Sequence, residues 1–175
     1  MLKKILKPLI HAATGNRKFY YNEVAKLAEH ATGARILELG SGVKVGDKYS
    51  YSTKHLFDDC KEFLQTDLNP EFGHKIVDAT TMDYNKRFDM ILCLNVLEHV
   101  FEHQKAVDNM HRALKKGGKL VVAVPFCFPL HDEPGDYWRY TEHSLRKILG
   151  NFSKVELKHQ RARILPTGYF AVAEK

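Results

Sequence analysis

Two glycines and a carboxylate lie close together in the segment ILELGSGVKVG, residues 36–46. Its apolar residues predict the end of a buried strand, and Gly40-Ser41-Gly42 predicts a turn that lets a small molecule approach the backbone. A turn that binds a pyrophosphate needs a third glycine, but Val45 stands at that position. Glu38, two residues before Gly40, would also repel a phosphate and attract a cation. The segment therefore favours a cationic ligand without phosphate.

Two further carboxylates end predicted strands. Asp67 closes the segment EFLQTD, and Asp78 closes KIVD. In an open parallel sheet the ligand lies beyond the C-terminal ends of the strands, so these side chains would meet the glycine turn at one edge. S-adenosylmethionine fits this arrangement, because it carries a sulfonium and an ammonium but no phosphate. Asp67 could accept hydrogen bonds from both ribose hydroxyls, and Asp78 could accept one from the adenine amine.

The segment FCFPLHDEPGDYWRYTEHSLRKIL, residues 126–149, offers a second group of reactive side chains. Its proline and glycine residues predict a shaped loop. Three aromatic residues, Tyr137, Trp138 and Tyr140, are more than a solvated linker needs. We therefore expect a substrate loop, about residues 126–141, to fold over the reaction site.

Two interpretations of this loop remain open. In the first, His131 is a general base near the acceptor, and Asp136, Tyr137 and Arg139 position it or order the loop. In the second, the aromatic residues only pack the loop onto the sheet, while Asp132 or Asp136 pairs with Arg139.

His99 and His103 lie four residues apart after a predicted strand, a spacing that can hold a metal ion on one turn of a helix. The neighbouring glutamates do not follow the HExxH spacing, and the sequence indicates no third ligand. We therefore expect no metal site, and His99 could instead face the pocket.

Length and composition predict one domain. A chain of 175 residues with 44% hydrophobic content can bury roughly 70% of its unfolded surface around a single core. We expect a helical cap over residues 1–32 and the core over 33–175.

Cys60, Cys93 and Cys127 form no CxxC pair, which argues against a disulfide framework or a zinc knuckle and favours the cytoplasm.

The net charge of +6 is concentrated in two clusters. Lys3, Lys4 and Lys7 interrupt the apolar N-terminus, so we do not expect this segment to be a signal peptide. It could touch an anionic membrane surface weakly, or its lysines could simply be solvated on a capping helix. No segment is long and apolar enough to span a bilayer. The other cluster could meet nucleic acid, but no aromatic-interleaved motif accompanies it, and we expect no such partner. It comprises Lys154, Lys158, Arg161 and Arg163.

Strand-like and helix-like periods alternate along the chain, which predicts an α/β fold with an open, mostly parallel sheet and an antiparallel pair at its end. An amphipathic helix runs from about Tyr20 to Ala31 and ends at Gly33. The other helices are expected at about 53–59, at 106–114, stopped by Gly117-Gly118, and at 142–149. The strands are expected at 34–39, 62–66, 75–78, 87–95, 118–125, 154–159 and 169–173.

An ordered set of segments then resembles a known family. ILELGSG, FLQTD, KIVDAT, FDMILCLNVLEHV and GGKLVVAVP together resemble the class I, Rossmann-like S-adenosylmethionine-dependent methyltransferases, in particular the methyltransferase type 11 group. The resemblance runs from about residue 34 to the end of the chain. It implies a Rossmann-like three-layer sandwich whose seven-stranded sheet is mostly parallel and has an antiparallel last strand.

The resemblance also implies a cofactor site for S-adenosylmethionine, with S-adenosylhomocysteine as the product. Glu38, Gly40 and Gly42 would surround the methionine part, and Asp67 would bind the ribose. Asp78 and Ala79 would lie by the adenine, and Asn95 would contact the amino group through its backbone. Ser41 and Leu68 complete the implied cofactor-binding residues. Two features depart from the family pattern: Lys44 replaces a usual glycine, and VGDKYSYSTKHLF replaces the usual regular helix. The path of this loop therefore stays open.

We expect no added substrate domain, and therefore an acceptor that is small or exposed. By resemblance, a hydroxyl of a sugar or of another metabolite is favoured. The pI near 9.1 leaves an RNA methyltransferase as an alternative. The altered glycine loop leaves a non-catalytic, S-adenosylmethionine-binding regulatory protein as another. The oligomeric state cannot be predicted from the sequence.

Overall fold

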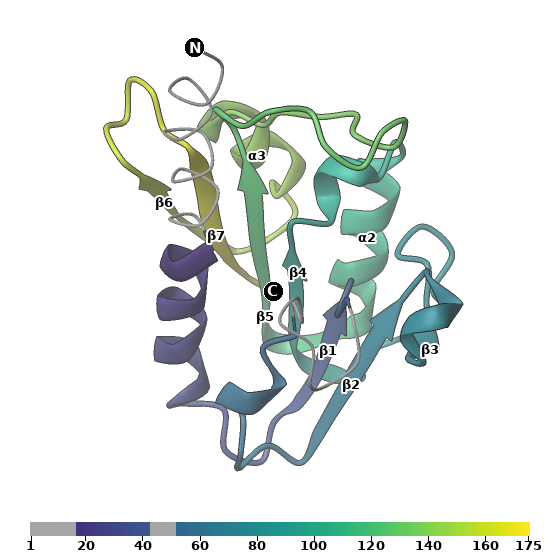
Figure 1. The fold of residues 1–175 in the computed structure, drawn as a ribbon. Helices are drawn as coiled ribbons and strands as arrows, with labels where there is room; N and C mark the ends of the chain where they lie inside the picture. Colours follow the sequence, from purple (N-terminus) through teal and green to yellow (C-terminus); the bar gives the residue numbers. More distant parts are fainter. Residues whose placement is uncertain (1–16, 43–51) are drawn as a thin grey trace.

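The computed structural model describes residues 17–42 and 52–175 (Figure 1). The basic N-terminal cluster at residues 3–7 lies outside these ranges. So do positions 44–46, where the sequence departs from the usual glycine pattern, and most of the segment that was expected to replace a regular helix.

Seven strands form one sheet in the order β3-β2-β1-β4-β5-β7-β6. Pairing is parallel from β3 to β5, whereas β7 runs antiparallel to both β5 and β6. This confirms the predicted α/β sheet with its antiparallel last strand, and the strand order reverses between β1 and β4. The strands are β1 Arg35–Leu39, β2 Glu62–Asp67, β3 Lys75–Ile76, β4 Phe88–Leu94, β5 Leu114–Pro125, β6 Lys154–Gln160 and β7 Gly168–Glu174.

Helices cover both faces of the sheet, which makes three layers (Figure 1). A helix over residues 17–28 lies on one face, and α2 (His103–Ala113) and α3 (Glu142–Ile148) lie on the other. Short 3₁₀ turns are η1 Lys54–Leu56, η2 Pro70–Phe72 and η3 Leu97–His99. Within the described ranges, no helix is long and apolar enough to cross a membrane.

The core lies on both sides of the sheet because successive strand residues point to opposite faces. Ile36 packs with Val24 of the N-terminal helix, whereas its neighbour Leu37 packs with Met110 of α2 and Leu145 of α3. All five side chains are fully buried. Burying an aliphatic side chain of this size contributes about 1.5–3 kcal/mol, so the two faces clamp the strands whose ends carry the site.

Two expected helix boundaries were wrong. The glycines at 117–118 do not end α2, which already stops at Ala113, and β5 begins at the next residue. Gly117 has φ +74°, and a Cβ on Gly118 would lie 2.9 Å from the carbonyl oxygen of Lys115. The register between β4 and β5 shifts in the same region, so these glycines shape an irregularity within a strand. The helix expected over 53–59 is only the short turn η1.

Candidate cofactor and acceptor site

Glu38 is buried at the C-terminal end of β1 and is 2% exposed. One carboxylate oxygen accepts hydrogen bonds from the hydroxyls of Ser41 and Ser52 at 2.8 and 2.6 Å. The other accepts from the backbone N–H and the hydroxyl of Thr53, both at 2.7 Å. Four bonds offset the cost of burying this charge. Glu38 therefore holds the glycine turn and the segment after residue 51 to the same point.

The glycine turn is bonded closely to the neighbouring strand ends. Gly40 and Gly42 have φ +67° and +68°, and a Cβ on Gly40 would lie 2.4 Å from Cγ2 of Val96. The N–H of Gly42 donates to Asp67 Oδ2 at 2.9 Å, and the N–H of Ser41 donates to the carbonyl of Thr66 at 2.9 Å. Only glycine fits at position 40 without moving its neighbour.

The predicted ribose and adenine residues follow β2 and β3. Asp67 also accepts the N–H of Asn69 at Oδ1, and Leu68 beside it is 61% exposed. Asp78 accepts the N–H and the hydroxyl of Thr80 at 2.7 and 2.8 Å, and Ala79 is buried. An ionised carboxylate has about four acceptor positions, so Asp67 and Asp78 can each accept further bonds from a ligand.

Asn95 follows β4 at the same edge and is exposed. Its φ of +53° lies in the left-handed region, and its N–H donates to the carbonyl of Ala123 in β5 at 2.8 Å. This conformation is uncommon outside glycine, although asparagine tolerates it better than most residues. The structure thus brings the ends of β1, β2, β4 and β5 together where the strand order reverses, the position at which open α/β sheets bind ligands.

An internal ion pair holds the loop after β5. Arg139 binds both carboxylate oxygens of Asp136, at 2.6 and 2.7 Å, and Asp136 is 1% exposed. This bidentate pairing holds the pKa of the Asp136 carboxyl well below its usual range and raises the pKa of Arg139. The N–H of His131 donates to Asp136 at 3.0 Å. Asp136, rather than Asp132, is therefore the partner of Arg139.

The aromatic residues dock this loop onto the segment after β4. Trp138 Nε1 donates to the carbonyl of Val100 at 3.2 Å, and the buried Tyr140 hydroxyl donates to the carbonyl of Leu97 at 3.0 Å. The N–H groups of Tyr137 and Trp138 both donate to the carbonyl of Glu98. Trp138 and Tyr140 thus pack the loop, whereas Tyr137 stays half-exposed.

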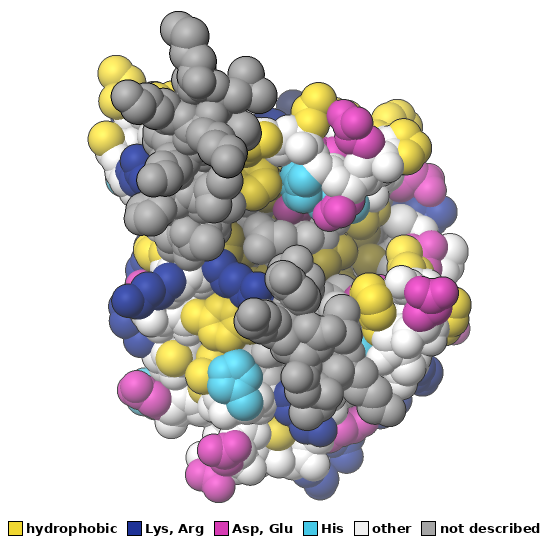
Figure 2. Space-filling view, viewed as in Figure 1, with side chains coloured by type: hydrophobic (Ala, Val, Ile, Leu, Met, Phe, Trp, Pro, Cys, Tyr) yellow, Lys and Arg dark blue, Asp and Glu magenta, His cyan; other side chains and the backbone are white. Residues whose placement is uncertain are grey.

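His131 of this loop faces His99 of η3. The centroids of His99 and His131 are 4.9 Å apart, and the ring planes are inclined by 80°. His99 Nδ1 lies 3.0 Å from the carbonyl oxygen of Gly135, and His131 Nδ1 lies 3.2 Å from that of Pro129. Figure 2 shows acidic and histidine side chains gathered over this loop. His103 instead packs its ring against Trp138.

Glu98 is a feature that the sequence analysis missed. It is fully buried, and burial raises its pKa to about 8. Within the described part of the chain, neither of its carboxylate oxygens receives a hydrogen bond from another residue. The sequence feature that could have identified Glu98 is its position: it lies within the first turn after a buried strand and next to a histidine.

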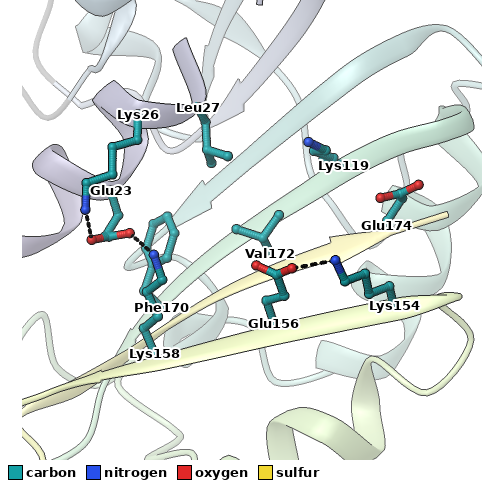
Figure 3. Close-up of a pocket in the computed structure, with 10 residues that line it drawn as sticks. All are labelled: Glu23, Lys26, Leu27, Lys119, Lys154, Glu156, Lys158, Phe170, Val172 and Glu174. Carbon is teal, nitrogen blue, oxygen red and sulfur yellow. Dashed lines mark hydrogen bonds and ion pairs between the residues drawn. The ribbon is translucent and has the colours of Figure 1, made fainter. Parts of the chain in front are cut away.

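Ion pairs dominate a groove that lies away from the candidate site (Figure 3). It lies between the N-terminal helix and strands β5 to β7, near the start of β5. Lys158 pairs with Glu23, and Lys154 pairs with Glu156 at 2.6 Å. Arg163, from the same predicted basic cluster, pairs with Glu142. These carboxylates break the continuous positive surface that a nucleic acid would need.

Known proteins resemble the chain in sequence and in fold. MJ1123 of Methanocaldococcus jannaschii is 29% identical over 112 residues, which cover 62% of this chain and 53% of that protein. The chain spans about half, or less, of the length of the curated relatives it matches.

Solved structures of methyltransferases share the fold. A SAM dependent methyltransferase from Archaeoglobus fulgidus superposes with a TM-score of 0.65 at 15% identity, covering 91% of this chain and 94% of that one. The 1,6-didemethyltoxoflavin-N1-methyltransferase of Burkholderia thailandensis, solved with S-adenosylhomocysteine, has a TM-score of 0.64 at 18% identity, covering 89% and 78%. At these identities the likeness shows the Rossmann-like fold alone.

A family model described as a methyltransferase domain matches residues 13–163. The match covers most of the 175 residues and includes every strand from β1 to β6. It confirms the resemblance seen in the sequence and supports methyl transfer with S-adenosylmethionine as the methyl donor. The chain belongs to the methyltransferase-domain family.

Proposed function

We propose that this chain transfers the methyl group of S-adenosylmethionine to a hydroxyl of a small molecule, such as a sugar or another metabolite. The observation that carries the proposal is the polar edge at the reversal of the strand order. There Asp67, Asp78 and the turn Gly40-Ser41-Gly42 offer acceptors and close backbone approach to a cationic nucleoside.

The cofactor residues are assigned by their place on this edge. Gly40, Ser41 and Gly42 lie against the methionine part, and Glu38 supports that turn through its hydrogen bond to Ser41. Asn95 contacts the amino group through its backbone.

The nucleoside part lies beyond β2 and β3. Asp67 and Leu68 contact the ribose, whereas Asp78 and Ala79 contact the adenine. These positions fit the group, because both carboxylates keep acceptor capacity for a ligand.

When bound, S-adenosylmethionine supplies an electrophilic methyl group. The chain's own residues orient the acceptor in line with that methyl and exclude water, which are the main contributions available to such a displacement. His131 takes the hydroxyl proton at Nε2, since its Nδ1 faces the carbonyl of Pro129. Asp136 and Arg139 hold the ring in place, and Tyr137 lies at the rim of the acceptor site.

The paired charges of β6 do not favour an RNA substrate. The cysteines are free thiols, which supports a reducing compartment such as the cytoplasm. Release of S-adenosylhomocysteine in the presence of hydroxyl acceptors distinguishes an enzyme from a regulatory binding protein.

The test is calorimetry with S-adenosylmethionine and S-adenosylhomocysteine. We expect micromolar binding that Asp67→Ala weakens by at least roughly tenfold, because each hydrogen bond to a charged group contributes about 1.5–3 kcal/mol. Asp83→Ala is the matched control, since that side chain is almost fully exposed. No binding by the native chain, or equal binding by the Asp67 variant, would contradict the assignment.

A further inference from the structure

An unpartnered carboxylate and a histidine of η3 face a histidine of the loop after β5. One ligand atom from each of Glu98, His99 and His131 lies within 4.8 Å of the other two. Glu98 is 0% exposed, and within the described residues its oxygens receive no hydrogen bond from another residue. Burying a carboxylate without a partner is costly, and a bound cation would remove that cost.

Hydrogen bonds orient both histidine rings so that each can offer its other nitrogen to a cation. The carbonyl oxygen of Gly135 can only accept, so His99 Nδ1 carries the proton and Nε2 presents its lone pair. His131 Nδ1 faces two acceptors, the carbonyl of Pro129 and a carboxylate oxygen of Asp136, each at 3.2 Å. A ring N–H donated to a carbonyl or a carboxylate is the usual support of a histidine that binds metal through its other nitrogen.

The distances between the ligand atoms of Glu98, His99 and His131 are compatible with binding of one ion. Ligand atoms that lie about 2.0–2.2 Å from a metal are about 3–3.5 Å from one another, so side-chain shifts of about 1 Å close the cluster. Asp132 supplies a nearby fourth group, because its Oδ2 is 4.0 Å from His99 Nε2. That side chain is exposed, and its backbone φ is +51°. The site therefore has three inner ligands and an open side towards solvent.

We propose that Glu98, His99 and His131 bind one divalent transition-metal cation. Two imidazoles and one carboxylate suit ions from Mn²⁺ to Zn²⁺ better than Ca²⁺, which prefers oxygen ligands alone. The site lies where β4 ends and the loop after β5 returns, beside the proposed cofactor edge. A hydroxyl held by the cation would ionise more readily, and His131 would then be a ligand rather than the base. That role rests on the proposed function, whereas cation binding does not.

The experiment is a titration of the tag-free full chain with Co²⁺, followed by visible absorption and by calorimetry. We expect one saturable site, and at least a tenfold loss of Co²⁺ affinity in Glu98→Gln and in His131→Gln. His143→Gln is the matched control, because that imidazole is 82% exposed, faces Glu142 and is not one of the three clustered groups. Co²⁺ should also raise the thermal midpoint of the native chain but not that of Glu98→Gln.

Two outcomes would overturn the proposal: no saturable binding by the native chain, or undiminished binding by both variants. If Glu98→Gln does not fold, His131→Gln and His99→Gln decide in its place. Binding of S-adenosylhomocysteine is measured on the same samples. A chain that binds S-adenosylhomocysteine but no Co²⁺ refutes the metal site alone, and a chain that binds Co²⁺ but not S-adenosylhomocysteine refutes the proposed function alone.

Discussion

Replacing Gly40 by alanine tests how the turn after β1 is built. The φ of +67° costs an ordinary residue about 1–2 kcal/mol. The new Cβ would also lie 2.4 Å from Cγ2 of Val96, and overpacking of this kind costs about 1–3 kcal/mol. We therefore expect Gly40→Ala to lower the free energy of unfolding by about 2–5 kcal/mol.

Two other variants separate the backbone cost of the positive φ from the cost of overpacking against Val96. Gly33 has φ +72°, but within the described residues nothing lies within 4 Å of a Cβ built there. Gly33→Ala should therefore lose only the backbone part, about 1–2 kcal/mol. Val96→Ala removes the clashing methyl groups, so adding it to Gly40→Ala should cost less than the sum of the two single changes.

Urea unfolding followed by circular dichroism measures these differences. Equal losses for Gly33→Ala and Gly40→Ala would refute the close approach of Gly40 to Val96. Additive behaviour of the double variant would refute it as well. Binding of S-adenosylhomocysteine should weaken in Gly40→Ala and stay unchanged in Gly33→Ala, because only the former lies in the proposed site.

Two further predictions concern the loop after β5. Arg139→Gln should lower the free energy of unfolding by about 2–4 kcal/mol at pH 7, because it removes the arginine partner of the buried Asp136 carboxylate and leaves that carboxylate only its contacts with His131. The pairing depresses the pKa of Asp136, so its contribution is present above the unfolded pKa and is lost as the pH falls through the folded one. Urea unfolding from pH 7 to 3 should therefore show the stability difference between the two proteins narrowing at the acid end. Tyr140→Phe should cost about 1 kcal/mol through the lost bond to Leu97, measured by the same unfolding.

Much of the fold could be predicted because its signals are local. The buried strands are short apolar runs bounded by polar residues, and Gly40 marks a turn that no larger side chain could form. The start of β5 could not be predicted in this way. A glycine pair looks the same in sequence whether it ends a helix or shapes a strand, and only the pairing of Leu114 with Phe88 distinguishes the two.

The candidate site was harder to predict because its contacts span long sequence separations. The bond between His99 and Gly135 joins residues 36 positions apart, and it forms only when the loop docks on η3. Glu98 reads as an ordinary helical glutamate until that loop covers it. The four bonds to Glu38 likewise depend on the return of the chain at Ser52 and Thr53.

Glu98 contacts the loop after β5 through its backbone and the two histidines through its side chain. Its carbonyl receives the N–H groups of Tyr137 and Trp138, while its side chain faces the two imidazoles. A displacement of this residue that releases the loop would also spread the ligand atoms apart. Opening of the loop after β5 would therefore separate the ligand atoms of Glu98, His99 and His131. Conversely, a cation bound to these three residues would hold the loop in its closed position.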